Sequence, residues 1–197
     1  MNFLAHLYLS GDDPDVMTGN FIGDFVKGRQ LAEKYPPGVV SGIELHRAID
    51  SFTDSHPVVA ESKKRLRPAY RHYSGVIVDI YYDHFLAVGW GRFHDALLPD
   101  YADHCYGMLQ KRMSSLPEEV QYMLPYMING NWLVNYSKTE GIHRALSGMA
   151  RRTRFDSKME FAVNDLKQHY TLFNAEFDAF FPELIEYCDQ WRVSHSK

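Results

Sequence analysis

The segment VDIYYDHFL, residues 78–86, is strongly apolar but carries three side chains that could bind a metal or move a proton. Asp79 and Asp83 are four residues apart, and His84 directly follows the second aspartate. On a helix, residues four apart lie on nearly the same face, and the next residue is turned by about 100°. The segment therefore predicts two carboxylates on one face of a largely buried helix, with an imidazole beside them.

Three other segments also place an acid or an imidazole among apolar residues. His46, Asp50 and Asp54 form a stripe at a spacing of four within ELHRAIDSFTD. Asp24 lies in FIGDFV, and His6 lies in FLAHLYL. Four segments that must pack together in a chain of 197 residues thus carry such side chains where the pattern favours burial.

The electrostatics of this set favour a bound cation. Two unpaired carboxylates that approach each other away from water repel, and each costs on the order of several kcal/mol to desolvate. Few Lys or Arg occur in these segments to balance the charge. A divalent metal would neutralise the carboxylates and use the imidazoles as well. A mixed imidazole and carboxylate set suits Mn, Fe, Zn or Ni, whereas an all-oxygen set would suit Mg or Ca.

Each of these residues also has a purely structural alternative. A lone histidine on an apolar helix, such as His6, is more often a core residue whose ring bonds to a carbonyl group. Asp50 and Asp54 could form a solvated face beside Arg47, and Asp79 could cap the start of its helix. The metal site is favoured because the same kind of residue occurs on several separate helices.

The elements that position these side chains are expected to be helices. Apolar residues recur at spacings of three and four, and β-branched alternation is scarce. The pattern predicts a single all-α domain, a helical bundle, over residues 1–197. The expected helices cover 3–8, 16–28 (closing at Gly28), 39–56, 58–70 (interrupted around Pro68), 74–90, 95–113, 118–136, 140–152, 156–180 and 183–192.

Composition narrows the class of protein. A hydrophobic fraction of 45% argues against disorder, and a net charge of −4 argues against nucleic acid as a partner. Cys105 and Cys188 are far apart and form no CxxC motif, which fits a reducing cytoplasm. MNFLAHLYLS lacks the basic start of a signal peptide, and no apolar run approaches the ~20 residues that span a bilayer. We therefore expect a cytoplasmic protein with no membrane segment.

Six motifs resemble a known family. They are MNFLAHLYLS, GNFIGDFVKG, GIELHRAIDSFTDSHP, DIYYDHFL, WLVNY and GIHRALSGMARR. In this order, over nearly the whole chain, they resemble the acyl carrier protein phosphodiesterases, also called holo-acyl-carrier-protein hydrolases. The resemblance implies an all-helical fold related to the HD-type metal phosphohydrolases, as an atypical member, since the adjacent pair here is Asp83–His84 in reversed order. It also implies cleavage of 4′-phosphopantetheine from the serine of holo acyl carrier protein, which gives the apo protein.

The resemblance implies a divalent metal, with Mn²⁺ favoured and Mg²⁺ and Fe²⁺ as the other candidates. The residues expected to hold it are Asp24, His46, Asp50 and Asp83. Asp79 or His84 would orient water or act as a general acid, and His6 would be a further ligand or a phosphate donor.

The expected substrate is an acidic carrier protein, so docking needs a local basic patch on this chain. The first basic cluster is Lys63, Lys64, Arg65, Arg67 and Arg71, and the second is Arg144, Arg151, Arg152 and Arg154. Either cluster could instead be a solvated helix face. The sequence leaves the oligomeric state open.

Two other functions fit the same residues. One is an HD-like phosphohydrolase that acts on a small phosphoester or a nucleotide and needs no docking face. The other is a non-catalytic helical domain that binds a carrier protein. Bound or activating metal distinguishes the enzyme from the binding domain.

Overall fold

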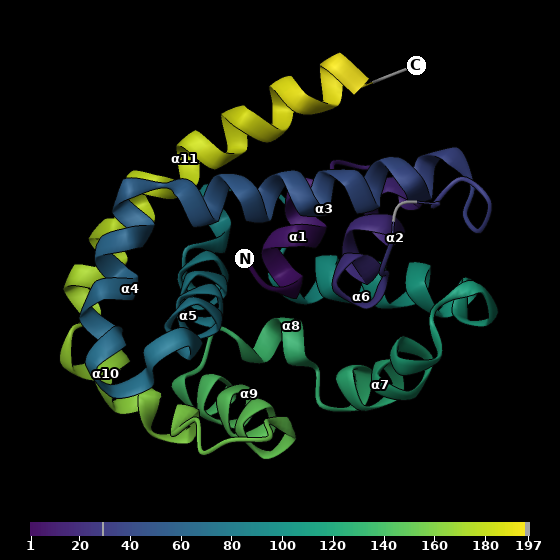
Figure 1. Cartoon of the computed structure of the whole chain (residues 1–197). Coiled ribbons are helices and arrows are strands. Elements are labelled where there is room, and N and C mark those ends of the chain that lie inside the picture. The colour runs from purple at the N-terminus through teal and green to yellow at the C-terminus, as the bar shows by residue number, and fades with distance from the viewer. Residues whose placement is uncertain (29, 196–197) are drawn as a thin grey trace.

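All regular secondary structure is helical in the part of the chain that the structure, a computed structural model, describes: residues 1–28 and 30–195 (Figure 1). The helices are α1 (Phe3–Leu9), α2 (Pro14–Ile22), α3 (Pro37–Ser55), α4 (Pro57–Tyr70), α5 (Ser74–Val88), α6 (Leu98–Lys111), α7 (Glu118–Asn129), α8 (Trp132–Asn135), α9 (Thr139–Arg152), α10 (Ala162–Gln168) and α11 (Tyr170–His195). The expected all-α class is confirmed. None of these helices combines the length and apolar character needed to cross a bilayer.

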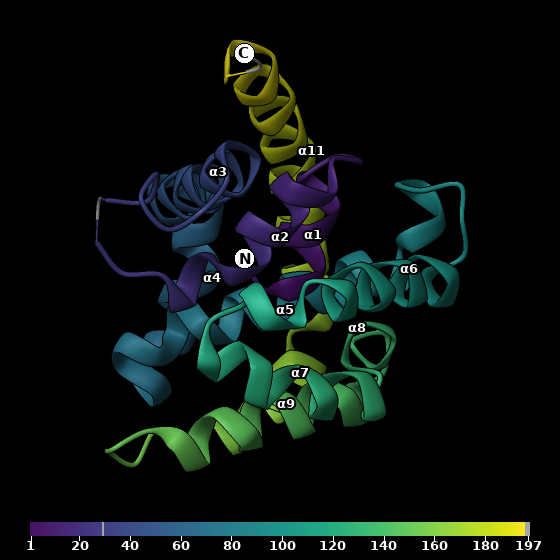
Figure 2. The same ribbon diagram turned by 90° about the vertical axis from the view of Figure 1, so that its right-hand side faces the viewer.

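Helix α5 is the central element of the core. Its residues are apolar on nearly every side, and it packs against α1, α4, α9 and α11. Tyr81 and Tyr82 meet the aromatic side chains of Phe173 and Phe177 on α11 edge to face. Such contacts add to the burial of large rings. Helix α11 follows α4 and α3 around this core, and its last turns extend beyond the other helices (Figures 1 and 2).

Two glycines allow α2 and α3 to cross in close contact. A Cβ atom on Gly19 would lie 2.0 Å from the carbonyl oxygen of Val39, and one on Gly42 would lie 2.1 Å from that of Val16. Any larger residue would force the helices apart, because real Cβ atoms do not approach so closely. The crossing sets the end of α2 directly beside the middle of α3.

Two prolines that the sequence predicts to interrupt or end a helix, Pro68 and Pro182, lie inside helices of the structure. The expected break before residue 183 is wrong, because α11 continues through Pro182. An internal proline costs about 3 kcal/mol, but the surrounding turns bury Phe180, Phe181 and Leu184 completely, and each buried side chain contributes about 1.5–3 kcal/mol. The expected interruption around Pro68 is also wrong, because α4 continues through Pro68, which lies in its last turn, and ends at Tyr70.

Other boundaries differ because the backbone turns where the apolar pattern continues. The expected helix 118–136 is divided into α7 and α8 at Asn131, whose φ of 42° is left-handed. The expected helix 156–180 is divided at His169, between α10 and α11. Helix α2 ends at Ile22 and is followed by a 3₁₀ turn, η1 (Gly23–Phe25), instead of continuing to Gly28.

Candidate metal centre

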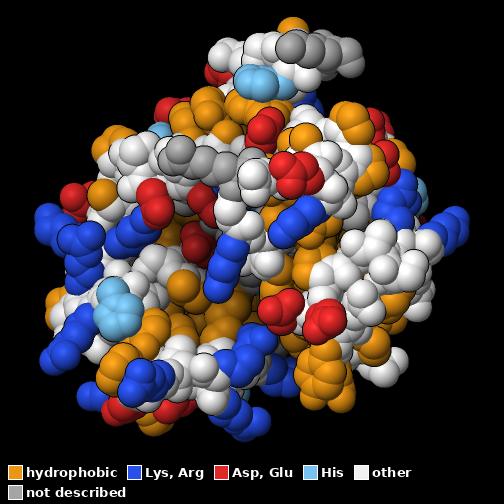
Figure 3. Space-filling view, turned by 45° about the vertical axis from the view of Figure 1, so that its right-hand side comes forward, with side chains coloured by type: hydrophobic (Ala, Val, Ile, Leu, Met, Phe, Trp, Pro, Cys, Tyr) orange, Lys and Arg blue, Asp and Glu red, His pale blue; other side chains and the backbone are white. Residues whose placement is uncertain are grey.

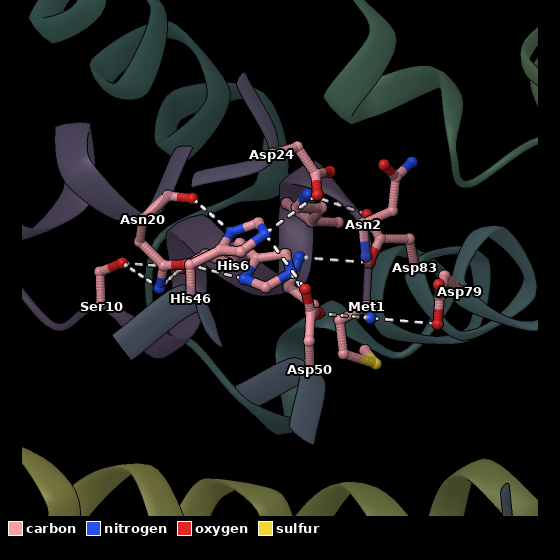
Figure 4. A network of polar contacts seen from close by, with 12 residues as sticks. Met1, Asn2, His6, Ser10, Asn20, Asp24, His46, Asp50, Asp79 and Asp83 are labelled. Atoms are coloured by element: carbon pink, nitrogen blue, oxygen red, sulfur yellow. Dashed lines mark hydrogen bonds and ion pairs between the residues drawn. The ribbon is translucent and has the colours of Figure 1, made fainter. Parts of the chain in front are cut away.

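Side chains from three elements converge beside the N-terminal helix (Figure 4). His6 comes from α1, His46 and Asp50 come from α3, and Asp24 comes from η1. The His6 Nε2 atom lies 3.3 Å from Asp50 Oδ1, and His46 Nε2 lies 3.2 Å from Asp50 Oδ2 and 3.3 Å from Asp24 Oδ1. The two imidazole rings stack with their centroids 4.0 Å apart. We call these four residues the centre.

One asparagine orients both imidazoles. Nδ1–H of His46 donates to the backbone carbonyl of Asn20 at 2.8 Å, and Nδ1–H of His6 donates to its side-chain oxygen at 2.7 Å. The amide nitrogen of Asn20 donates to the His6 carbonyl and to Ser10 Oγ, both at 2.9 Å, which fixes the amide orientation. Because each Nδ1 carries a proton, the neutral form of each ring directs the Nε2 lone pair towards Asp50.

The protonation of the centre follows from burial and the two carboxylates. Burial and the neighbouring His46 lower the pKa of His6 to about 4. Burial also opposes the charge on His46, but hydrogen bonds to Asp24 and Asp50 outweigh it and raise the pKa to about 9. Although burial disfavours the charge on Asp50, the hydrogen bond from His46 and the nearby Met1 ammonium lower its pKa, and the bond from His46 lowers that of Asp24. At neutral pH the centre therefore holds two carboxylates and one imidazolium.

The donor atoms of the centre fit a divalent metal. His6 Nε2 is buried and has no hydrogen-bond partner, and its lone pair faces a carboxylate oxygen 3.3 Å away. Two acceptors in this arrangement repel unless a cation lies between them. Ligand atoms about 2.1 Å from one cation lie about 3.0–3.4 Å apart, which matches the N–O distances observed here. His6, His46 and Asp50 place one ligand atom each within 4.8 Å of one another.

Asp24 lies on the solvent side of the centre. A Cβ atom on Gly23 would lie 2.2 Å from His46 Cγ, so only glycine allows η1 to lie against the imidazole. The Asp24 side chain is 71% exposed and that of Asp50 is 40% exposed, whereas His6 is buried. The centre is therefore open to a ligand from the side of Asp24.

Asp79 lies near the centre but does not contact its imidazoles. Its Oδ1 atom accepts from the Met1 ammonium group at 3.0 Å, and the same ammonium lies 3.6 Å from Asp50 Oδ1. Burial raises the pKa of Asp79, against the attraction of this cation. The Met1 ammonium group thus lies between Asp79 and Asp50 and links Asp79 to the centre.

The structure does not bring Asp83 to the centre. Its carboxylate is fully buried and accepts backbone N–H groups of Leu4 at 2.8 Å and of Asn2 and Ala5 at 3.3 Å. These are the free donors at the start of α1, so Asp83 caps that helix from α5. Burial raises the pKa of Asp83 to about 7 despite these bonds.

His84 also lies away from the centre. Its Nδ1–H donates to the carbonyl of Tyr136 at 2.7 Å, and its Nε2 accepts from the Tyr170 hydroxyl at 3.0 Å. Both ring nitrogens are therefore used in joining α5 to the end of α8 and the start of α11. Burial lowers the pKa of His84, which keeps the ring neutral.

The first basic cluster is partly neutralised within the chain. Lys63 pairs with Asp54 at 2.5 Å, and Arg65 forms two bonds with Glu176 at 2.7 and 2.9 Å. Asp54 therefore belongs to a surface ion pair and not to the centre. The exposed members of the cluster include Lys64 and Arg67.

The second basic cluster is more available to a partner. Arg144, Arg151 and Arg152 are exposed on α9 and line a cavity. Within residues 1–28 and 30–195, no acidic side chain forms an ion pair with Arg151 or Arg152. The guanidinium of Arg152 bonds to the carbonyl of Gly148 in its own helix.

Asn20 is the residue that sequence reasoning missed. It is an uncharged residue in TGNFIGD, four positions before Asp24, and nothing in its type marks it as part of a metal site. Its place in the motif GNFIGDFVKG, one helical turn before Asp24, is a signal that could have found it.

The helical fold and the centre together define a class: an all-α domain with a candidate His/Asp site for a divalent metal. The family model described as acyl carrier protein phosphodiesterase matches residues 1–184. The chain belongs to the acyl carrier protein phosphodiesterase family, as its motifs predicted.

Relatives with this name cover nearly the whole chain. The acyl carrier protein phosphodiesterase of Photorhabdus laumondii is 34% identical over 187 residues, which are 94% of each chain. The relative from Yersinia pestis is 33% identical over 186 residues, and the one from Escherichia coli is 36% identical over 193 residues. Each of these matches covers 94% of this chain and 96% of the relative. No solved structure matches the chain, so the relation to HD-type phosphohydrolases stays a prediction.

Proposed function

We propose that this protein is a metal-dependent phosphodiesterase that removes 4′-phosphopantetheine from holo acyl carrier protein. The observation that carries the metal dependence is the orphaned Nε2 atom of His6, which faces Asp50 beside a second imidazole. Membership of the acyl carrier protein phosphodiesterase family supports the substrate. The two free, buried thiols of Cys105 and Cys188 are compatible with the reducing cytoplasm where we place the reaction.

His6, His46 and Asp50 would hold the metal, and Asp24 would complete the set from the solvent side. Two nitrogen and two carboxylate donors suit Mn²⁺, Fe²⁺ or Zn²⁺, and we retain Mn²⁺ as the favoured ion. Once bound, such an ion polarises the phosphoryl oxygen and lowers the pKa of water. Asp83 and His84, whose hydrogen bonds are used within the fold, are left out of the chemistry.

The reaction that these residues would support is an in-line displacement at phosphorus. A bond forms between a water oxygen and phosphorus, and the bond between phosphorus and the serine oxygen breaks. One water proton leaves the nucleophile, and the serine oxygen gains a proton. Asp24 is the group placed to orient the water, because it is exposed at the mouth of the centre and its lowered pKa keeps it ionised. His6 and His46 are held in position by Asn20.

Two aspartates on α3 provide a matched test of this proposal. Asp50 lies in the centre, and Asp54, one turn later on the same helix, lies in the exposed pair with Lys63. Mass spectrometry of holo carrier protein incubated with the protein and Mn²⁺ measures the loss of the prosthetic group. We expect Asp50→Asn to lower kcat/KM by about a hundredfold or more and Asp54→Asn to change it by less than about threefold.

Near-normal turnover by folded Asp50→Asn protein would remove the centre from the mechanism. If the wild-type protein hydrolyses bis(4-nitrophenyl) phosphate but leaves holo carrier protein intact, it is a phosphodiesterase, but the carrier protein is not its substrate. If it binds no Mn²⁺, Fe²⁺ or Zn²⁺, the metal-dependent proposal falls.

A further inference from the structure

A cavity lies between α8 and α9. It has a volume of about 620 Å³, and its lining includes Trp132 of α8, Tyr136 directly after α8, and Ala145 and Met149 of α9. The space-filling view shows a hollow on this side of the molecule, with hydrophobic side chains on its floor and Lys and Arg side chains along its lower edge (Figure 3). A cavity of this size falls within the range of ~300–1,000 Å³ that holds organic ligands.

Hydrogen bonds to other parts of the fold hold the α8 wall of the cavity in place. The backbone N–H of Leu133 donates to the Tyr106 hydroxyl at 2.9 Å, and Asn2 Nδ2 donates to the Tyr136 hydroxyl at 2.9 Å. The left-handed residue Asn131 redirects the chain after α7 so that α8 reaches this position. The cavity is therefore a formed feature of the fold.

The cavity ends close to the centre. Phe3 lines the cavity, and His6 of the centre lies three residues later on α1. Residues three apart on a helix share a face and are separated by about 4.5 Å along the axis. A molecule with one end at the centre would therefore meet the cavity wall after about one helical turn.

The lining is suited to a neutral chain with amide groups. No acidic side chain lines the cavity among the described residues, and its walls are mainly aromatic and aliphatic. The Ser147 hydroxyl has no hydrogen-bond partner in residues 1–28 and 30–195, so it is free to bond a ligand amide. The cations, which include Arg144 and Arg151, are exposed and would face the protein to which such a chain is attached.

We propose that this cavity binds the pantetheine arm of the substrate while the phosphate of the arm lies at the centre. The assignment rests on the proposed function, which supplies the identity of the arm. The arm is uncharged beyond its phosphate, extended and contains two amides, and this composition matches apolar walls with an unpartnered hydroxyl. The arginines at the rim would then meet acidic residues of the carrier protein around the modified serine.

Gly148 allows a clean test, because the first atom of an added side chain meets no steric obstacle from other parts of the fold. It lines the cavity, and a Cβ atom on it would meet no atom outside its own helix within 4 Å. Gly107 on α6 is the matched control, since it is also helical, also open and not part of this cavity. In both positions the substitution removes a helical glycine, which favours folding.

Binding of free pantetheine, which has no phosphate, is measured by ligand-observed NMR for wild-type, Gly148→Leu and Gly107→Leu proteins. We expect Gly148→Leu to lose the signal and to raise KM for holo carrier protein at least about tenfold, with Gly148→Ala intermediate. Gly107→Leu should match the wild type in both measurements. Melting temperatures verify that each variant is folded.

Equal binding of pantetheine by wild-type and Gly148→Leu proteins, or no binding by the wild type, would overturn the assignment. These outcomes are independent of the hydrolytic proposal, because pantetheine carries no phosphorus and its binding needs no turnover. If pantetheine binding depends on Gly148 but holo carrier protein is not cleaved, the cavity assignment stands and the proposed reaction falls.

Discussion

Metal binding at the centre should depend steeply on pH, because the metal competes with a proton on His46. The pKa of His46 in the metal-free protein is about 9, since Asp24 and Asp50 accept its hydrogen bonds in a buried site. A metal needs the Nε2 lone pair, so binding below that pH must release this proton. His6 adds little to the effect near neutrality, because its pKa is lowered to about 4 and it is already neutral.

The size of the effect follows from this linkage. For each pH unit below the pKa of His46, the fraction of protein with a free Nε2 falls about tenfold, and the apparent Kd for Mn²⁺ rises by the same factor. Between about pH 8 and about pH 6 the Kd should therefore rise about a hundredfold, or about 2.7 kcal/mol. Affinity increases with pH because the unbound state holds one more proton than the bound state.

The Kd can be measured by the EPR signal of free Mn²⁺ in titrations at several pH values. Calorimetry in buffers with different ionisation enthalpies should give about one proton released per Mn²⁺ near neutral pH. The Asp54→Asn protein serves as a control, since Asp54 lies outside the centre and should leave the slope unchanged. A Kd that is constant across this range would refute either the raised pKa of His46 or its role as a ligand.

Three further predictions concern the residues around the centre. Gly23→Ala should lower both the affinity for Mn²⁺ and the melting temperature, because the added methyl group overlaps the imidazole ring of His46. An unchanged Kd for Mn²⁺ would contradict this packing. Asp83→Ala should reduce the free energy of unfolding by about 1.5–3 kcal/mol, because it leaves the buried N–H groups at the start of α1 without an acceptor, with little change in the Kd of the folded protein. Loss of metal with full stability would instead restore Asp83 as a ligand. Charge reversal at Arg151 and Arg152 should raise KM for holo carrier protein, and the rise should be larger at low salt, whereas charge reversal at Arg67 should leave KM unchanged. If both reversals raised KM equally, the carrier protein would not dock specifically at the cavity rim.

Much of the architecture could be read from local pattern. Apolar spacing of three and four predicted helices, and the near-continuous apolar run of residues 74–90 predicted the helix that became the core. The errors fall at boundaries. Pro182 did not end a helix, because buried aromatic side chains on both sides outweigh its cost, while Asn131 ended one where the apolar pattern continued. Tertiary packing decides such cases, and a local pattern does not contain it.

The sequence by itself determined which side chains needed a partner. An acid or imidazole within an apolar helix must be compensated, and this argument selected His6, His46 and Asp50 as well as Asp83. Only the tertiary structure decided what the partner is. A buried carboxylate is satisfied equally by a metal, an ammonium group or the free N–H groups at a helix start, and helical spacing cannot distinguish them. Asp83 meets the start of α1, whereas Asp50 meets two imidazole nitrogens, because α5 and α3 approach α1 from different sides.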